Sequence, residues 1–382
     1  GHAGKAFWFS KSSGEFVTSD YYYKQYPDWV SQWNVMKPAM AYAGKSWELL
    51  HKPSTYLFVD ADDREYETDF PGFGRTFPHA YGEAGDKYLT TRLTLGPAGD
   101  KLTLDFAKQL LDNEQLGQDE VPDFLAVSFS STDYVGHLFG ASSLEAEDNL
   151  AQLERTLADL LAYVDKKVGL ENTLIGLSAD HGQPEIPGHL HELGIEKAHY
   201  FETKSLVKAP AIAALKKKFG IGEELIEAFF QPYIYLNHDL INKKGLDQAA
   251  VEQAVADELM KFKGVAAAVS SSALRSASLP DTLLNRSILR NFHPKRSGDI
   301  YLVFEQNVFI NDFDGLTVAS THGSPWRYDT SVPVIFAGAA LQHKTVSRPV
   351  TPYDIAPTLS AYLGIKPPSA SIGNPLEEVL GN

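Results

Sequence analysis

The chain has 382 residues, of which 43% are hydrophobic and 12% aromatic, so it can bury a substantial core and has the composition of an ordered globular protein. Its formal net charge of −15 comes from acidic residues spread along the chain, which argues against a surface that binds nucleic acid. Cysteine is absent, which excludes disulfides and thiolate chemistry, and no apolar run is long enough to span a membrane. Nothing in the composition indicates a protein partner.

The amino-terminal segment, GHAGKAFWF, has neither an initiator Met nor a signal sequence with a basic and then an apolar part. It begins on glycines and aromatic residues that are typical of the middle of a fold. We therefore expect that an upstream part of the protein precedes this chain.

Two strands with a helix between them are predicted in the first half of the chain. The runs FLAVSFS (124–130) and TLIGLSA (173–179) are almost continuously apolar, as in parallel strands that are covered on both faces. Between them, Ser142 and Glu145 have the spacing of a capping box, and Gly169 follows the last helical position. Apolar residues recur in this interval at steps of three and four: Leu150, Leu153, Leu157, Leu160, Leu161 and Val164.

A further strand and helix are predicted near the carboxyl terminus. VPVIFAG (332–338) is the strand, and the helix after it can begin at Thr351 with Pro352 in its first turn and end at Gly364. The region 200–318 differs in composition, with a Lys-rich helix, an Ala-rich helix and the strands YIYLNHD and IYLVFEQ.

These elements predict an α/β fold, with a mostly parallel sheet flanked by helices and an inserted α+β cap. Residues 1–199 and 319–382 would form a metal-binding core, and residues 200–318 the cap.

Three groups of polar residues each lie next to a predicted strand. Asp133 and His137 follow the first strand, Asp180 and His181 follow the second, and His322 shortly precedes VPVIFAG. Open α/β sheets bind ligands at the carboxyl ends of their strands, so at least two of these groups should share one crevice. Carboxylate oxygen and imidazole nitrogen are ligands of zinc or manganese, and two such ions can clamp a phosphoryl group.

Each signal also has an ordinary structural explanation when it is taken alone. Asp133 can cap a helix, Asp180-His181 can be a polar turn, and His322 can be a loop histidine. The three together are harder to explain in this way, because each adjoins a predicted strand end. Three further histidines lie near the second group and are expected to be solvated loop residues: His189, His191 and His199.

The motifs SFSSTDYVGH, SADHG, THGSPWRYDTSVPVIFAG and YDIAPTLSAYLGI, in this order, resemble those of the alkaline phosphatase superfamily. The chain is most similar to the bacterial monomeric alkaline phosphatases, which are related to type I phosphodiesterases and nucleotide pyrophosphatases. The resemblance implies that Asp133, His137 and His322 hold one zinc ion, and that Asp180 and His181 hold a second. It also implies a periplasmic or secreted enzyme that hydrolyses phosphate monoesters through a covalent phosphoenzyme.

One departure from the family pattern concerns the catalytic nucleophile. The family carries its Thr or Ser nucleophile, a further metal-binding Asp and the residues that hold the phosphate before the segment that matches GHAGKAFWF. The nucleophile is therefore expected upstream of this chain, and residues 1–382 alone are expected to show little or no phosphatase activity.

Three other functions remain open at this point. A phosphodiesterase or nucleotide pyrophosphatase would use the same metal ligands, and a truncated remnant would bind metal without turnover. A cofactor-independent phosphoglycerate mutase fits less well, because its insertion and motifs differ from those of this chain.

Overall fold

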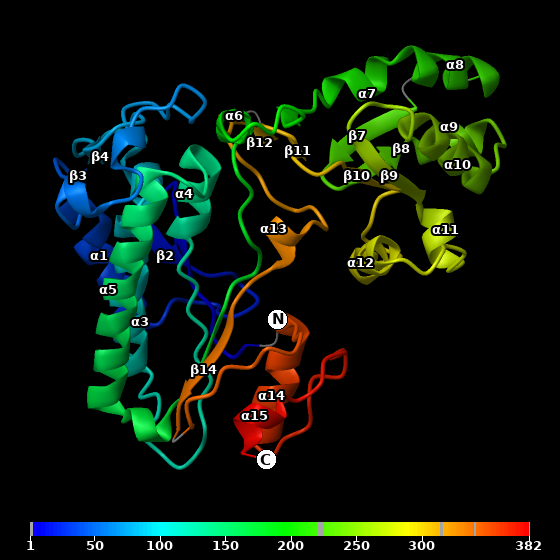
Figure 1. Cartoon of the computed structure of the whole chain (residues 1–382). Coiled ribbons are helices and arrows are strands. Elements are labelled where there is room, and N and C mark those ends of the chain that lie inside the picture. The colour runs from blue at the N-terminus through cyan, green and yellow to red at the C-terminus, as the bar shows by residue number, and fades with distance from the viewer. Residues whose placement is uncertain (1–2, 221–224, 314–315, 340, 382) are drawn as a thin grey trace. The chain divides into compact units, whose positions relative to one another are not determined.

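A computed structural model describes residues 3–220, 225–313, 316–339 and 341–381 (Figure 1). The chain divides into two compact units: unit 1 comprises Gly1–Asp180 and Val332–Asn382, and unit 2 comprises His181–Ser331. The insertion that the sequence predicts, at residues 200–318, remains a prediction, as does its role as a cap.

Unit 1 is mainly helical. Its α-helices are α1 (Asp28–Met36), α2 (Leu89–Thr94), α3 (Pro97–Asn113), α4 (Ser131–Phe139), α5 (Leu144–Lys167), α14 (Ile355–Tyr362) and α15 (Glu377–Leu380). Its strands are β1 (Trp8–Ser10), β2 (Glu15–Val17), β3 (Ser46–Trp47), β4 (His79–Ala80), β5 (Leu174–Ser178) and β14 (Val334–Gly338). Short 3₁₀ helices are η1 (Pro38–Tyr42), η2 (Pro53–Thr55), η3 (Val59–Ala61), η4 (Leu170–Asn172) and η5 (Pro352–Asp354).

The long helix α5 confirms the predicted helix between the two strands. It begins one residue later than the sequence suggested, because Ser143, and not Ser142, accepts the capping hydrogen bond from Ala146 N. Gly169 follows its carboxyl end with a φ of 89°, as expected for a residue just past a helix. Helices α3 and α4 both pack against α5 (Figure 1).

The buried face of α5 is polar, which the sequence did not reveal. Leu150 of the leucine pattern is exposed, whereas the buried residues include Glu145, Asp148, Asn149, Gln152 and Thr156. Asp148 accepts hydrogen bonds from Trp47 Nε1 at 2.6 Å, from Leu50 N and from the Tyr56 hydroxyl. This network ties α5 to the segment before β4.

The strands β5 and β14 confirm the predicted strands at 173–179 and 332–338. They pair with each other in antiparallel register, with Ile335 opposite Leu177. The prediction of a strand at 124–130 is wrong: among the backbone hydrogen bonds of the described residues, none joins this segment to a neighbouring strand. Its side chains alternate between exposed and half-buried, and Phe124 is 74% exposed. An apolar run therefore does not become a strand unless a partner completes its ladder.

The carboxyl-terminal helix begins as predicted. Thr351 and Asp354 form a capping box around Pro352, and η5 leads directly into α14. Gly364 follows the helix with a φ of 67°.

Unit 2 combines a four-stranded sheet with helices on both of its faces. Its strands are β6 (His199–Tyr200), β7 (Ile226–Phe230), β8 (Tyr233–Leu236), β9 (Val265–Ser270), β10 (Ile300–Phe304), β11 (Val308–Phe309), β12 (Asp312–Phe313) and β13 (Leu316–Thr317). Its helices are α6 (Pro187–Glu192), α7 (Lys204–Lys208), α8 (Pro210–Lys218), α9 (His238–Lys243), α10 (Gln248–Leu259), α11 (Ser271–Arg275), α12 (Leu283–Asn291) and α13 (Arg327–Thr330).

The four-stranded sheet is antiparallel, in the order β7-β8-β10-β9, and strand β10 shows why both faces are covered. Successive side chains of a strand point to opposite faces, and all five residues of β10 are buried. Ile300, Leu302 and Phe304 pack into the core with residues of α8, α9 and α10. Tyr301 and Val303 pack with residues of α11 and α12.

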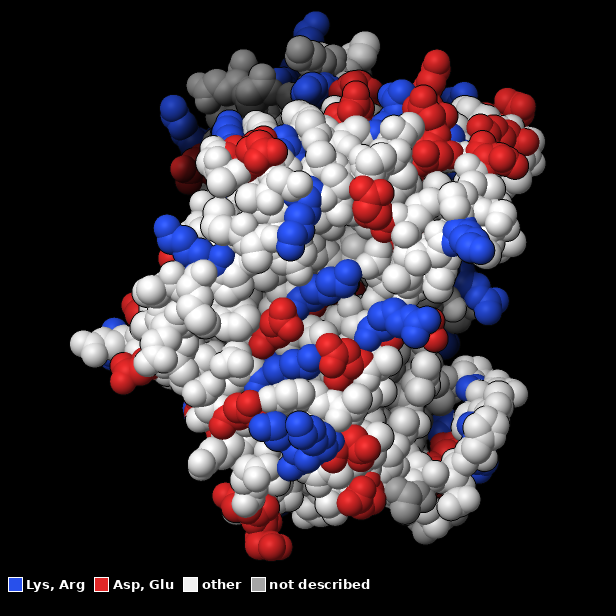
Figure 2. Space-filling model, turned by 90° about the vertical axis from the view of Figure 1, so that its left-hand side faces the viewer, with Lys and Arg blue, Asp and Glu red and all other residues white. Residues whose placement is uncertain are grey.

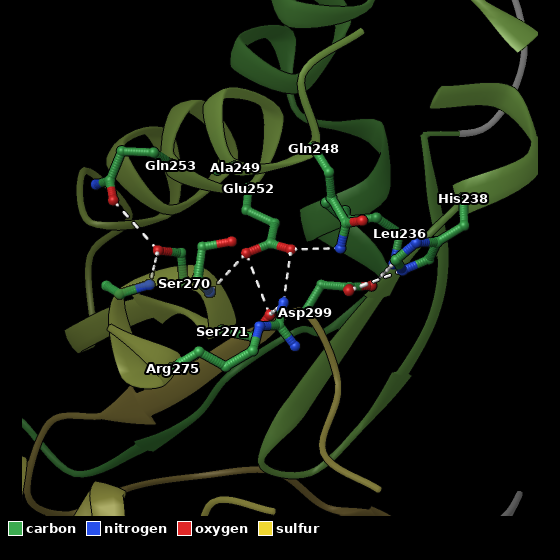
Figure 3. Close-up of polar contacts among 12 residues, drawn as sticks. Leu236, His238, Gln248, Ala249, Glu252, Gln253, Ser270, Ser271, Arg275 and Asp299 are labelled. Atoms are coloured by element: carbon green, nitrogen blue, oxygen red, sulfur yellow. Dashed lines mark hydrogen bonds and ion pairs between the residues drawn. The ribbon is translucent and has the colours of Figure 1, made fainter. Parts of the chain in front are cut away.

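Two buried acids form hydrogen bonds at the ends of strands of this sheet (Figure 3). Glu252 of α10 accepts hydrogen bonds from Ser271 Oγ and Ser272 N at the start of α11. Asp299, which precedes β10, accepts hydrogen bonds from Leu236 N and from His238 Nε2 at 2.8 Å.

The predicted α/β class is confirmed, but the strand pairing differs from the prediction of a mostly parallel sheet. Among the ladders of the described residues, β6 and β11 pair in parallel, and the others are antiparallel. On the face drawn in Figure 2, basic and acidic side chains are interspersed. No helix in the described part of the chain is long and apolar enough to cross a membrane.

Candidate active site

Asp133 and His137 lie on one face of helix α4 in unit 1. Both residues lie within the helix, where a separation of four residues brings their side chains together on its surface. His137 Nε2 lies 3.4 Å from Asp133 Oδ1. The His137 side chain is almost fully buried and the Asp133 side chain is one-third exposed, so the pair opens to the surface through the carboxylate.

Two neighbouring helices hold α4 in place. Asp100 of α3 is buried and accepts a hydrogen bond from Ser131 N, in the first turn of α4, at 3.1 Å. Burial raises the pKa of the Asp100 carboxyl to about 6. Asn149 of α5 donates a hydrogen bond to the Thr132 hydroxyl. Asp100 and Asn149 do not stand out in the sequence, because nothing in their local sequence indicates that they contact α4.

His181 and His322 meet in unit 2, although they are far apart in the sequence. Their imidazole rings lie nearly parallel, with centroids 3.4 Å apart and an angle of 14° between their planes. Both rings are half-buried. The structure therefore brings together the second and third of the histidine groups that the sequence singled out.

The loop that carries His181 is attached closely to helix α13. Gly182 N donates a hydrogen bond to the carbonyl oxygen of Asp329 at 2.7 Å. A Cβ atom at Gly182 would lie 2.1 Å from the carbonyl oxygen of Tyr328, so only glycine allows this approach. A second link comes from Ser320, whose hydroxyl accepts a hydrogen bond from Gln183 Nε2 and donates one to the carbonyl of Pro184.

The loop that carries His322 is held by the side chain of Asp329. This carboxylate accepts hydrogen bonds from Gly323 N at 3.1 Å, Ser324 N at 2.7 Å and Ser324 Oγ at 2.6 Å. Burial raises the pKa of Asp329, and these hydrogen bonds oppose that rise. A pocket lies beside this loop, and its lining includes Gln231, Thr321, His322 and Asp329.

The remaining predicted ligand, Asp180, is exposed and lies two residues beyond the end of β5 in unit 1. The convergence of Asp133 and His137 with His322 on one ion remains a prediction, as does the pairing of Asp180 with His181.

The three nearby histidines are not the loop residues that the sequence analysis expected. His189 and His191 lie on α6, where His189 Nδ1 contacts Glu192 Oε2 at 3.2 Å and His191 Nε2 contacts the carbonyl of Ala198 at 2.6 Å. His199 lies on β6 and contacts the carbonyl of Lys197. Each of the three therefore has a local hydrogen-bond partner.

Comparison with known proteins identifies the family. The family model described as type I phosphodiesterase / nucleotide pyrophosphatase matches residues 1–325. The chain is 34% identical over 382 residues to alkaline phosphatase PafA of Elizabethkingia meningoseptica, covering 98% of this chain and 68% of that protein. It is 32% identical over 382 residues to alkaline phosphatase PhoV of Synechococcus elongatus, covering 100% of this chain and 67% of that protein.

One further relative carries a different name. The chain is 36% identical over 386 residues to a Myroides odoratus protein named calcium-transporting ATPase, covering 100% of this chain and 69% of that protein.

A solved structure shows the same fold. The crystal structure of wild-type alkaline phosphatase PafA matches with a TM-score of 0.86 at 32% identity, over 98% of this chain and 70% of that one. The chain belongs to the type I phosphodiesterase / nucleotide pyrophosphatase family, in the bacterial alkaline phosphatase branch of the alkaline phosphatase superfamily, and is a phosphoric ester hydrolase.

Proposed function

We propose that the protein hydrolyses phosphate monoesters at a centre of two zinc ions. Asp133, His137 and His322 would hold one ion, and Asp180 and His181 would hold the other. The observation that carries the proposal is the contact between His181 and His322, which unites two imidazole donors from distant segments. Two carboxylates and three imidazoles make a donor set that suits zinc.

The protein's own part in this reaction is to hold ligands in place. Bound zinc would supply positive charge that stabilises the attacking and leaving oxygens at phosphorus. Helix α4 presents Asp133 and His137 as a pair, and helix α13 holds the two loops that carry His181 and His322. The resemblance implies a covalent phosphoenzyme formed on a Thr or Ser, and we assign that role to no residue of the described chain.

A phosphodiesterase of the nucleotide pyrophosphatase type is the second candidate function. The matching family model carries that description, whereas the relatives PafA and PhoV are named alkaline phosphatases. We favour the monoesterase because of those relatives, and we propose a periplasmic or secreted location on the same basis. A phosphate ester is the partner that this function requires.

The test measures metal content and substrate preference together. Protein produced together with the upstream part that the sequence leads us to expect should contain zinc, hydrolyse p-nitrophenyl phosphate faster than bis-p-nitrophenyl phosphate, and lose this activity on treatment with EDTA. Zinc should restore the activity. A preference for the diester would favour the second candidate, and activity that survives removal of all metal would contradict the zinc centre.

A further inference from the structure

We propose that Asp329 is a positioning residue that fixes the two histidine loops, residues 181–184 and 320–325, relative to each other. The proposal rests on the proposed function, in which His181 and His322 bind metal. It concerns how the metal-free protein holds these two histidines in position. The sequence motif THGSPWRYD contains Asp329, but nothing in the motif shows what this acid contacts.

The side chain of Asp329 holds the His322 loop. Asp329 is only 4% exposed, and its Oδ2 atom accepts all three hydrogen bonds from Gly323 and Ser324. These donors include the two backbone N–H groups that directly follow His322. Gly323 has a φ of 109°, a conformation that glycine adopts without strain but that other residues disfavour, so the turn after His322 depends on this glycine as well as on Asp329.

The main chain of Asp329 holds the His181 loop. Its carbonyl oxygen accepts the hydrogen bond from Gly182 N, the residue directly after His181. One residue thus bonds to the immediate neighbours of both histidines, through its side chain on one side and its backbone on the other. This arrangement gives a direct cause for the contact between the two rings.

Helix α13, which carries Asp329, is itself fixed to the rigid part of unit 2. Trp326 Nε1, just before the helix, donates a hydrogen bond to the carbonyl of Phe304 at the end of β10. Tyr328 packs against Phe309 of β11. Strand β10 is fully buried at the centre of the sheet, so the position of Asp329 is set by the core of the unit.

A second contact between the loops should limit the effect of substituting Asp329. Ser320 bonds to Gln183 and Pro184 without using Asp329. Removal of the Asp329 carboxylate should therefore loosen the His322 loop and leave the His181 loop attached. Outer residues that orient metal ligands typically contribute 10-fold to 100-fold to metal affinity, and we expect a loss in that range.

The experiment compares zinc affinity in wild-type protein, Asp329→Ala and Asp329→Asn, by calorimetric titration with Zn²⁺ alone. Asp329→Ala should weaken binding by about 10-fold to 100-fold. Asp329→Asn should stay within about threefold, because its amide oxygen can accept the same hydrogen bonds. The control is Asp299→Ala, which removes another buried carboxylate of unit 2 but frees Leu236 N and His238 instead, and its zinc affinity should match wild type.

A second, milder pair of variants covers the case in which the alanine variants do not fold. Ser324→Ala removes one donor to Asp329, whereas Ser270→Ala removes the hydroxyl that caps α11. Zinc affinity should fall in the first variant only. In metal-free protein, the ring proton resonances of His181 and His322 should also move in Ser324→Ala, because each ring lies over the other, while those of His238 should not.

The outcomes separate this inference from the function on which it rests. Wild-type protein that binds no zinc would contradict the proposed metal centre. If wild-type protein binds zinc, unchanged affinity in both folded Asp329→Ala and Ser324→Ala would overturn the positioning role alone. An equal loss in Asp299→Ala, or a loss in Asp329→Asn as large as in Asp329→Ala, would also overturn it.

Discussion

The imidazole rings of His181 and His322 lie face to face, with their centroids 3.4 Å apart. The two residues come from separate loops of unit 2, and both loops are bonded to Asp329. Unit 2 therefore builds this contact by itself, as unit 1 builds the pair of Asp133 and His137.

The first prediction concerns whether His137 and His322 bind the same ion. Zinc affinity is measured for His137→Ala, His322→Ala and the double variant. If both residues bind one ion, the second substitution costs much less once the first is made, because the site is already incomplete. Each single variant should weaken binding by at least about 100-fold, since it removes one of few ligands.

The control for this cycle is His189→Ala, because His189 is held by Glu192 on α6. This variant should bind zinc like wild type. Strictly additive losses in the double variant would mean that His137 and His322 serve different ions.

The second prediction concerns the close approach at Gly182. In protein that includes the expected upstream part, Gly182→Ala should lower both zinc affinity and phosphatase activity by at least about 10-fold, because the new methyl group would collide with the carbonyl of Tyr328 and displace the His181 loop. The matched control is Gly176→Ala on β5, where the nearest atom to a new Cβ, on Phe336, is 3.5 Å away. Equal activity in the two variants would show that the loop tolerates the shift.

A buried group of ionisable residues in unit 1 leads to the third prediction. His79 is fully buried and contacts Glu145 Oε1 through Nε2 at 3.1 Å. Burial lowers the pKa of His79 to about 4, so the ring is neutral at physiological pH. Burial, with the nearby Glu145 as the second cause, raises the pKa of Glu67 to about 9.

The contribution of Glu67 to stability should therefore fall as the pH rises from about 5 to about 9, whereas the lowered pKa of His79 acts in the opposite direction below about pH 6.5. In this window folded Glu67 keeps its proton and unfolded Glu67, with a pKa of 4.5, has lost it, so the folded state binds more protons. Glu67→Gln has no proton to lose, so its advantage over wild type in the free energy of unfolding should grow across the window, by up to about 1.4 kcal/mol per pH unit, and its melting temperature should rise relative to wild type. Thermal melts at several pH values measure this, and a difference that stays constant with pH would refute the shifted pKa.

The fourth prediction concerns the buried carboxylate of Asp148. Asp148→Asn should lower the free energy of unfolding by about 2–3 kcal/mol, because a charged acceptor of several buried donors is replaced by a neutral amide. Zinc affinity should not change, since Asp148 contacts none of the proposed ligands. Urea denaturation measures the loss. Asp159→Asn on the same helix is the control, because Asp159 is exposed and its ion pair with Lys108 should contribute less than about 1 kcal/mol.

Local sequence patterns predicted several elements correctly. The helix at 144–167, the strands at 174–178 and 334–338 and the capped helix after Thr351 follow from apolar periodicity and capping residues. The identities of Asp133, His137, Asp180, His181 and His322 as candidate ligands also came from the sequence, because ligand chemistry depends on residue type and the motifs resemble a known family. These properties are local, so a linear sequence carries them.

Tertiary structure alone decided which residues meet. The contact between His181 and His322, the support from Asp329 and the buried polar face of α5 depend on segments that are distant in the chain. The strand predicted at 124–130 failed for the same reason, since a strand exists only with a hydrogen-bonded neighbour. Burial, hydrogen-bond partners and pKa shifts are properties of the environment of a side chain, and the fold creates that environment by bringing remote segments together.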